Sequence, residues 1–166
     1  MARPSLHVST ICTGNICRSP MAEVVLQHLI AEDSLLKDHV VVTSAGTARW
    51  HVGSPMDPRA RGALDRAGFQ QPGSLATYAD AAYLKLQDFV VVMTREHLRE
   101  VVDRLQPTAQ FLLWRNLLEP GLDLDVPDPY FGNDQEFDDC LAIFRAAGPR
   151  LTSVLRQQWG ERSNEV

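Results

Sequence analysis

Short apolar runs rich in β-branched residues alternate along this chain with segments whose apolar residues recur at helical spacing. The run at 89–93 is apolar throughout, which is typical of a strand buried on both faces of a parallel sheet. Segment 20–33 instead places Ala22, Val25 and Leu26 on one face of a helix, because they lie three and four residues apart. This alternation favours an α/β fold in which helices cover both faces of a parallel sheet.

The pattern predicts one domain over residues 1–166, a length that suits a single hydrophobic core. Strands are expected at 6–11, 40–43, 89–93 and 111–113. Helices are expected at 20–33, 58–68, 79–86, 95–105 and 134–159. We expect Gly68 to end the second helix and Gly148-Pro149 to interrupt the last one.

One long segment, 115–133, shows no periodicity and contains three prolines and two glycines. Unstructured loops longer than about 12–15 residues are uncommon inside compact domains, and those that occur are often functional. We therefore expect this segment to cross the active site.

The composition bounds the class of protein. Hydrophobic residues make up 45% of the chain and charged residues 22%, which is typical of a folded globular protein. The net charge of −5 argues against nucleic acid as a partner, although a local cluster of donors can still bind an anion. No run approaches the roughly 18 apolar residues of a membrane span, and no signal peptide is recognisable. Three cysteines, an odd number, fit a reducing compartment, so we expect a cytoplasmic protein; export without a signal peptide stays open.

The segment Cys12–Pro20 reads Cys-Thr-Gly-Asn-Ile-Cys-Arg-Ser-Pro and directly follows the first predicted strand. A turn from strand to helix at the carboxyl edge of a parallel sheet directs free backbone N–H groups at an anion. Arg18 adds a planar, permanently charged guanidinium that suits two phosphate oxygens. These donors favour the thiolate of Cys12, which makes it a nucleophile at neutral pH. Gly14 and Asn15 supply backbone freedom, because both tolerate positive φ.

The cysteines of this segment also allow a structural role or a metal site. A lone cysteine after a strand is usually a small buried hydrophobe, but the order of the neighbouring residues favours catalysis. Cys12 and Cys17 have no second ligand pair at zinc-like spacing, and neither nucleotide-binding glycine pattern occurs, so no metal or cofactor is expected. Ser19 is expected to cap the following helix, with Pro20 at its first position.

The nine residues from Cys12 to Pro20 resemble the phosphate loop of the low-molecular-weight protein tyrosine phosphatases, and look closest to bacterial, particularly actinobacterial, members. The resemblance continues at 44–47, 50–53 and 128–131 and so spans nearly the whole chain. It implies a four-stranded parallel sheet flanked by helices on both faces, with the phosphatase P-loop after strand 1. It also implies hydrolysis of phosphotyrosine and aryl phosphates.

The resemblance assigns three catalytic residues. Cys12 would attack phosphorus and form a phosphocysteine, while Arg18 and the loop amides hold the phosphate oxygens. Asp128 would protonate the departing phenolate and then activate water. Considered alone, an aspartate in a proline-rich loop is an ordinary solvated residue.

The resemblance also implies a set of residues that bind the substrate or shape its site. Asn15 and Ser44 would brace the loop, and Ser19 would donate to the thiolate of Cys12. Three aromatic side chains would form walls deep enough to favour phosphotyrosine over phosphoserine. The set is Thr13, Gly14, Asn15, Ile16, Cys17, Ser19, Trp50, Tyr130 and Phe131. Cys17 either forms a reversible disulfide with Cys12 or is a packed thiol, and both interpretations stay open.

Three positions depart from many relatives. Thr94 stands where an aspartate is common, and a histidine that braces Asn15 has no evident match near 71–73. Phe131 replaces a tyrosine, which leaves Tyr130 as the one possible target of a tyrosine kinase in this motif. These changes bear on the bracing of the loop more than on its chemistry.

Two other functions compete with the phosphatase. Arsenate reductases share this fold and loop, but they need additional cysteines; only Cys140, expected to be an ordinary helix residue, remains, and 85–99 holds no cysteine pair. A phosphotyrosine-binding adaptor would not need Cys12 or Asp128. The expected partners are phosphotyrosine proteins and phosphate or other oxyanions, whereas the physiological substrate stays open among host proteins, a bacterial tyrosine kinase and phosphorylated metabolites.

Overall fold

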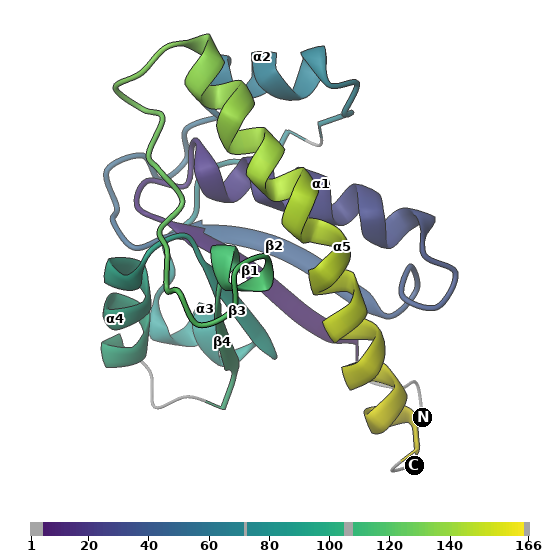
Figure 1. Cartoon of the computed structure of the whole chain (residues 1–166). Coiled ribbons are helices and arrows are strands. Elements are labelled where there is room, and N and C mark those ends of the chain that lie inside the picture. The colour runs from purple at the N-terminus through teal and green to yellow at the C-terminus, as the bar shows by residue number, and fades with distance from the viewer. Residues whose placement is uncertain (1–4, 72, 105–107, 165–166) are drawn as a thin grey trace.

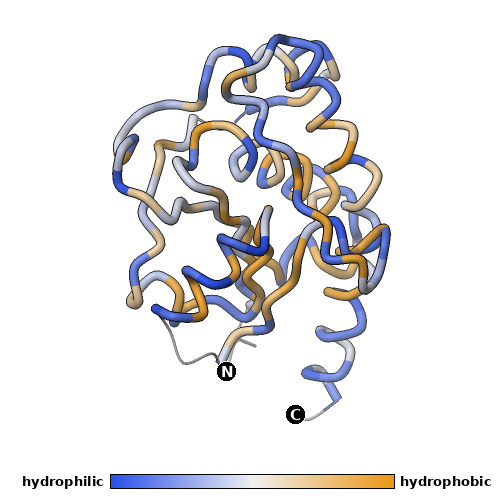
Figure 2. The backbone as a smooth tube through the Cα atoms, turned by 60° about the vertical axis from the view of Figure 1, so that its left-hand side comes forward, coloured by the Kyte–Doolittle hydropathy of each residue, from blue (hydrophilic) through white to orange (hydrophobic). Residues whose placement is uncertain are grey.

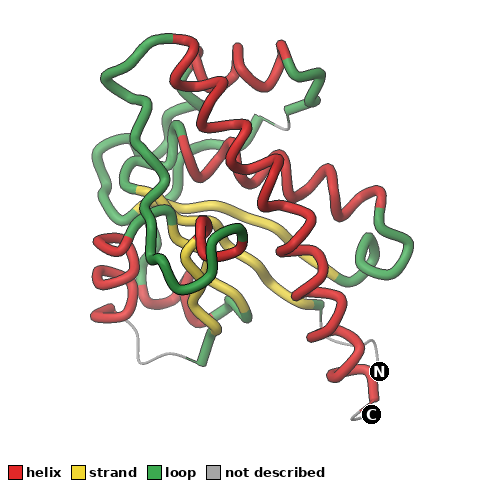
Figure 3. Tube along the Cα trace, in the orientation of Figure 1, coloured by secondary structure: helices red, strands yellow, loops and turns green. Residues whose placement is uncertain are grey.

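The computed structural model describes residues 5–71, 73–104 and 108–164. Its centre is a parallel sheet in the order β2-β1-β3-β4 (Figures 1 and 3). The strands are β1 (Leu6–Cys12), β2 (Val40–Gly46), β3 (Phe89–Val92) and β4 (Gln110–Leu113). Cys12, the last residue of β1, lies beside Gly46, the last residue of β2. The predicted four-stranded parallel sheet is therefore confirmed.

Helices cover both faces of the sheet, as expected (Figure 1). One face carries α1 (Arg18–Glu32), α2 (Pro58–Arg66) and α5 (Asp134–Asn164), together with the short 3₁₀ helix η1 (Trp114–Leu117). The opposite face carries α3 (Ala81–Lys85) and α4 (Arg95–Arg104). The last residue of the helix expected at 95–105 lies outside the described residues.

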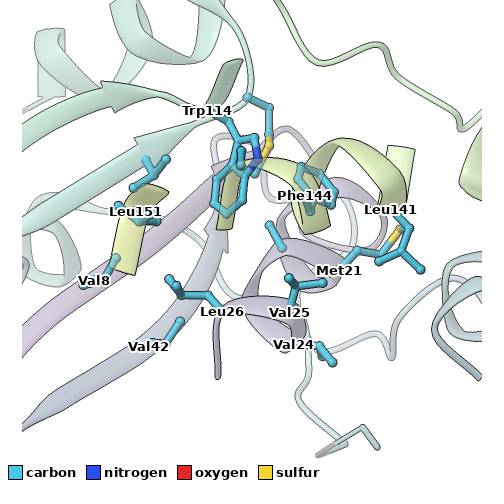
Figure 4. Packing of buried hydrophobic residues seen from close by; sticks show 14 of the residues in the cluster. Val8, Met21, Val24, Val25, Leu26, Val42, Trp114, Leu141, Phe144 and Leu151 are labelled. Atoms are coloured by element: carbon cyan, nitrogen blue, oxygen red, sulfur yellow. The ribbon is translucent and has the colours of Figure 1, made fainter. Parts of the chain in front are cut away.

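Each face of the sheet has its own hydrophobic core. On the α1 and α5 side, Trp114 packs edge-on against Phe144 with ring centroids 5.2 Å apart (Figure 4). On the α3 and α4 side, Val90 and Val92 of β3 pack with Leu84. Burial on both faces explains why β3 is apolar throughout. In Figure 2 the central strands are mostly hydrophobic, whereas the C-terminal end of α5 is mostly hydrophilic.

The expected interruption of the last helix is wrong, because α5 continues through Pro149. Tertiary packing holds it there: a Cβ on Gly148 would lie 2.6 Å from Cδ1 of Leu29, so this glycine lets α5 approach α1 closely. The Thr152 hydroxyl also donates to the Pro149 carbonyl at 2.8 Å. Packing of the apolar face therefore outweighs the hydrogen bond that the proline cannot make.

The expected capping role of Ser19 is also wrong. Helix α1 begins at Arg18, and its N-cap residue, Cys17, makes no side-chain cap. Ser19 is the second helical residue, and its hydroxyl lies 3.0 Å from Cys12 Sγ instead of turning to the helix N–H groups. Pro20 is the third helical residue, where its missing N–H would have had no intrahelical partner in any case.

Within the described residues, no helix combines the length and the apolar character needed to cross a membrane.

Candidate active site

The phosphate loop, residues 13–17, joins β1 to α1 and is bound to the end of β2. The Thr47 N–H donates to the Cys12 carbonyl at 2.9 Å, and the Ala48 N–H donates to that of Thr13 at 3.0 Å. Gly46 permits this approach, because a Cβ there would lie 2.5 Å from the Thr13 carbonyl oxygen. Asn15 has the expected positive φ, 57°. The turn that presents the loop amides is therefore fixed by backbone contacts.

Asn15 holds the loop from behind through both ends of its side-chain amide. Its Oδ1 accepts the backbone N–H of Thr77 at 2.9 Å, a contact that fixes the orientation of the amide. Its Nδ2 donates to Ser19 Oγ at 2.7 Å and to Ser44 Oγ at 2.9 Å. The side chain of Asn15 therefore needs no histidine partner, because the backbone N–H of Thr77 donates to its Oδ1.

The donors in this network determine where the Ser19 proton points. An amide nitrogen can only donate, so Ser19 Oγ accepts from Asn15 and keeps its own hydrogen for another acceptor. Cys12 Sγ lies 3.0 Å away, whereas the alternative acceptor, the Ala45 carbonyl, lies at 3.4 Å. The hydroxyl therefore donates to Cys12.

The hydrogen-bond network continues from Asn15 to the buried carboxyl group of Glu23, which was not among the predicted site residues. Ser44 Oγ accepts from Asn15 and donates to Glu23 Oε2 at 2.5 Å. Gln27 Nε2 donates to the other Glu23 oxygen at 3.2 Å. Burial raises the pKa of Glu23, and the bonds from Ser44 and Gln27 oppose this rise. The only sequence signal was an acidic residue next to the apolar stripe of α1.

Arg18 joins the phosphate loop to the segment before α5. Its side chain is buried, and Nη1 donates to the Val126 carbonyl at 3.1 Å. Nη2 lies 3.3 Å from Asp128 Oδ2. The Val126 N–H donates to the Met93 carbonyl at 2.8 Å, which fixes this segment at the end of β3. Segment 115–133 therefore crosses the site as expected and brings Asp128 beside the loop.

The other aspartates of this segment have structural partners. Asp125 Oδ1 accepts the backbone N–H of Arg95 at 2.9 Å, at the start of α4. Asp123 Oδ1 accepts from Asn116 Nδ2 at 2.7 Å. Thr94, which replaces a common aspartate, accepts the His97 N–H at 3.1 Å and so stabilises the first turn of α4.

His97 is a further contact of the phosphate loop that sequence reasoning missed. It lies buried in the first turns of α4, with Nε2 2.8 Å from Thr13 Oγ1. Its Nδ1 is buried and has no partner among the described residues. Burial, together with the positive charge of Arg18, lowers the pKa of His97 to about 3. The loop is therefore braced by a neutral imidazole.

This burial predicts a pH dependence of stability. Between about pH 6.5 and pH 3 the unfolded chain binds a proton on His97 that the folded protein does not bind, so stability falls as the pH falls. His97→Gln can still donate to Thr13 but does not titrate. We expect the variant to lose on the order of 3–5 kcal/mol less than the wild type between pH 7 and pH 3. Urea unfolding across this range checks this; parallel curves for both proteins would contradict it.

The loop forms the floor of a cavity of about 230 Å³. Trp50, His51, Tyr130 and Phe131 contribute ring side chains to its lining, and the ring centroids of His51 and Tyr130 lie 6.5 Å apart. Trp50 is 79% exposed and Phe131 94% exposed, so both stand at the rim and not in the core. The lining residues are Cys12, Thr13, Gly14, Ile16, Cys17, Arg18, Trp50, His51, Asp128, Tyr130 and Phe131.

The structure separates the predicted site residues into two groups. All line the cavity except Asn15 and Ser19, which lie buried behind the loop and act through the hydrogen bonds described above. Gly14 has no positive φ, and its lack of a side chain instead makes room for His51, since a Cβ would lie 2.8 Å from Cδ2 of that ring. His51 is the lining residue that the predicted set omitted.

The three cysteines are free and buried. Burial, followed by the negative charge of Asp57, raises the pKa of Cys17 beyond its usual range, so this residue stays a thiol. Burial raises the pKa of Cys140 in α5 to about 12. Among the described residues, no group of three or more histidine, cysteine or acidic side chains is placed to hold a metal ion.

Comparisons with known proteins show the family of this chain. The family model described as low molecular weight phosphotyrosine protein phosphatase matches residues 7–161. The low molecular weight protein-tyrosine-phosphatase of Streptomyces coelicolor is 39% identical over 158 residues, which cover 92% of this chain and 94% of the relative. Low molecular weight protein-tyrosine phosphatase A of Mycobacterium tuberculosis is 38% identical over 152 residues, with coverage of 88% and 89%.

The solved structure of YfkJ from Bacillus subtilis matches with a TM-score of 0.84 and 27% identity, and the match covers 95% of this chain and 99% of that one. Sequence and fold therefore agree along nearly the whole length, and the chain belongs to the low molecular weight phosphotyrosine protein phosphatase family.

Proposed function

We propose that Cys12, Arg18 and Asp128 hydrolyse the phosphate ester of phosphotyrosine in proteins. One observation carries the assignment of roles: the buried Cys12, which accepts a hydrogen bond from Ser19, lines the same cavity as Arg18 and Asp128, and these two side chains lie 3.3 Å apart. Nucleophile, phosphate clamp and proton donor are the three parts that a phosphocysteine mechanism needs.

The first half of the reaction transfers the phosphoryl group to the protein. The Cys12 thiolate attacks phosphorus, the bond from phosphorus to the phenolic oxygen breaks, and that oxygen takes a proton from Asp128. The amides of the loop and Arg18 hold the remaining phosphate oxygens, whose charge they stabilise in the transition state. Loss of a neutral phenol instead of a phenolate lowers the barrier.

The second half returns the enzyme to its initial state. The Asp128 carboxylate takes a proton from a water molecule, and the water oxygen attacks the phosphorus of phosphocysteine. The sulfur–phosphorus bond then breaks, which releases inorganic phosphate and restores the Cys12 thiolate. One carboxyl group thus serves as acid and then as base.

The ion pair between Arg18 and Asp128 has a consequence for binding. In the free enzyme, the guanidinium that is to hold phosphate contacts the carboxylate that is to act as acid. A phosphate dianion competes for the same donors, because it offers two oxygens in the plane of the guanidinium. Its binding frees Asp128 to take up the proton that it later donates and to turn towards the leaving oxygen.

The depth of the site supports phosphotyrosine as the substrate. Cys12 is 3% exposed, whereas Trp50 and Phe131 at the rim are almost fully exposed, so a phosphate must be carried on a long side chain to reach the sulfur. An aromatic ring fills the slot between these rings, where it buries apolar surface. Phosphoserine is too short to place its phosphate on the loop while its backbone stays outside.

The structure also bears on the rival functions. Cys140 lies buried in α5, where burial keeps it a thiol, so a disulfide cascade of the arsenate reductase kind lacks an accessible third cysteine. The free, buried cysteines support a reducing compartment such as the cytoplasm. Tyr130, 38% exposed at the rim, is the proposed target if a tyrosine kinase acts on this protein.

A direct comparison of substrates tests this function. The purified protein is expected to hydrolyse a phosphotyrosine peptide with a kcat/KM at least about 100-fold above that of the matching phosphoserine peptide, because only the longer side chain reaches the nucleophile. Arsenate reduction coupled to thioredoxin serves as the parallel assay. Equal rates on both peptides, or arsenate reduction in place of hydrolysis, would refute the proposal.

A further inference from the structure

An exposed arginine, Arg49, directly precedes the cavity-lining Trp50 and has no acidic partner among the described residues. The guanidinium of Arg49 lies over the ring of Tyr78, with its Cζ 3.8 Å from the ring centroid. Among the described residues, its side chain forms no hydrogen bond and no ion pair. Stacking uses the face of a guanidinium and leaves its N–H groups, which point outward in its plane, free for an acceptor.

The ring beneath Arg49 is itself held in place. Tyr78 is half-buried and pairs with Gly46 at the end of β2. A second arginine, Arg104, has its Cζ 4.9 Å from the same ring. Its donors are already in use, since Nη2 donates to the Thr47 carbonyl at 2.6 Å and Nη1 to that of Ala79 at 3.3 Å. Arg104 therefore helps to hold the Tyr78 ring in place, and of these two arginines only Arg49 has free donors.

The position of Arg49 relative to the phosphate loop is fixed by its neighbours in the chain. The residue before it, Ala48, donates its N–H to Thr13 of the loop at 3.0 Å. The residue after it, Trp50, lines the cavity. A peptide that leaves the cavity over Trp50 consequently passes Arg49.

We propose that Arg49 is a specificity-determining residue that binds a carboxylate of the substrate, within about three residues of the phosphotyrosine along an extended peptide. The inference rests on the proposed function and adds a preference for acidic sequences around the phosphorylated tyrosine. A carboxylate matches the in-plane N–H groups of a guanidinium in two parallel bonds. Stacking on Tyr78 restrains the side chain before binding, which lowers the entropy lost on binding.

The location makes this charge unusual in the molecule. The chain carries a net charge of −5, so its overall charge repels a negatively charged peptide. An unpaired arginine beside the cavity attracts a negatively charged peptide locally, in spite of the negative net charge. Because the pair would be exposed to solvent, its effect is modest and weakens as salt is added.

The test uses phosphotyrosine peptides in an alanine background, with a single glutamate or lysine placed at each of three positions on either side of the phosphotyrosine. For the wild type we expect glutamate at one or two of these positions to raise kcat/KM about threefold to fivefold over alanine. In Arg49→Ala this ratio should fall to about one, and in Arg49→Glu lysine should be preferred at the same positions. Both values of kcat/KM in this ratio come from the same variant, so a partial loss of active enzyme lowers both equally and leaves the ratio unchanged.

Matched variants make the result specific. Arg150→Ala removes an exposed arginine of α5 that has no ion pair among the described residues, and it should keep the wild-type ratio. Tyr78→Phe keeps the ring and should keep the preference, whereas Tyr78→Leu should reduce it. Equal kcat/KM for all peptides with the wild type, or an unchanged ratio in Arg49→Glu, would overturn the inference and leave the phosphatase function standing. Hydrolysis of none of the peptides would overturn both.

Discussion

Cys12→Ser is expected to lower kcat on phosphotyrosine peptides by on the order of 10⁴-fold or more, the scale seen when the nucleophile of a covalent mechanism is removed. A serine hydroxyl keeps its proton at neutral pH and offers no anion to attack phosphorus. The donors of the site remain, because Arg18 keeps its bond to Val126 and the loop backbone keeps its contacts with 46–48. Inorganic phosphate should therefore still bind.

Steady-state kinetics and calorimetric titration with phosphate together check this result. Cys140→Ala is the matched control, since it removes another buried cysteine, in α5, that the mechanism does not use. It should keep turnover. Retention of substantial activity by Cys12→Ser would contradict the covalent mechanism, and loss of phosphate binding along with activity would point to a collapsed loop instead of a missing nucleophile.

Asp128→Ala is expected to reduce kcat by roughly 10²–10⁴-fold, the range for a positioned proton donor. The loss should be largest for phosphotyrosine, whose phenolate is a strong base, and smaller for aryl phosphates with acidic phenols. The variant also lacks the carboxylate that lies 3.3 Å from Arg18. Phosphate should consequently bind more tightly than to the wild type, because nothing competes for the guanidinium.

Two neighbouring carboxylates provide controls for Asp128. Asp123→Asn and Asp125→Asn each alter a residue that the structure assigns to local hydrogen bonds, with Asn116 and with the start of α4. Neither should change the dependence of rate on the leaving group. A small loss in Asp128→Ala that is uniform across leaving groups would make Asp128 a residue that merely positions its segment.

Most of the fold could be predicted from local sequence patterns. Short apolar runs predicted the four strands, and β3 was recognisable because both of its faces are buried. The errors came from tertiary contacts that a local pattern does not contain. Pro149 continues a helix because Gly148 lies against Leu29, a residue about 120 positions away in sequence. Ser19 does not cap the helix, because its hydroxyl forms a hydrogen bond with Cys12 across the loop.

The same distinction holds for the site. The loop could be predicted because its cysteine, glycine, asparagine and arginine are contiguous and each suits phosphate for its own chemical reason. His97 and Thr77 could not be predicted, because each contacts the loop only through the tertiary packing of α4 and of segment 75–79. Arg49 gave no signal, since an arginine beside a tryptophan is ordinary until Tyr78 is seen beneath it.

The central claim is that the phosphoryl group is carried on the sulfur of Cys12. It is tested most directly by mixing the enzyme with a phosphotyrosine substrate, quenching in acid during turnover, and mapping the phosphate by mass spectrometry of the digested protein. Asp128→Ala, which should hydrolyse phosphocysteine slowly, is the variant in which the intermediate should accumulate most. We predict one phosphoryl group on the peptide that contains Cys12, and none in Cys12→Ser. Turnover without any phosphorylated cysteine, or with phosphate on a different residue, would contradict the account.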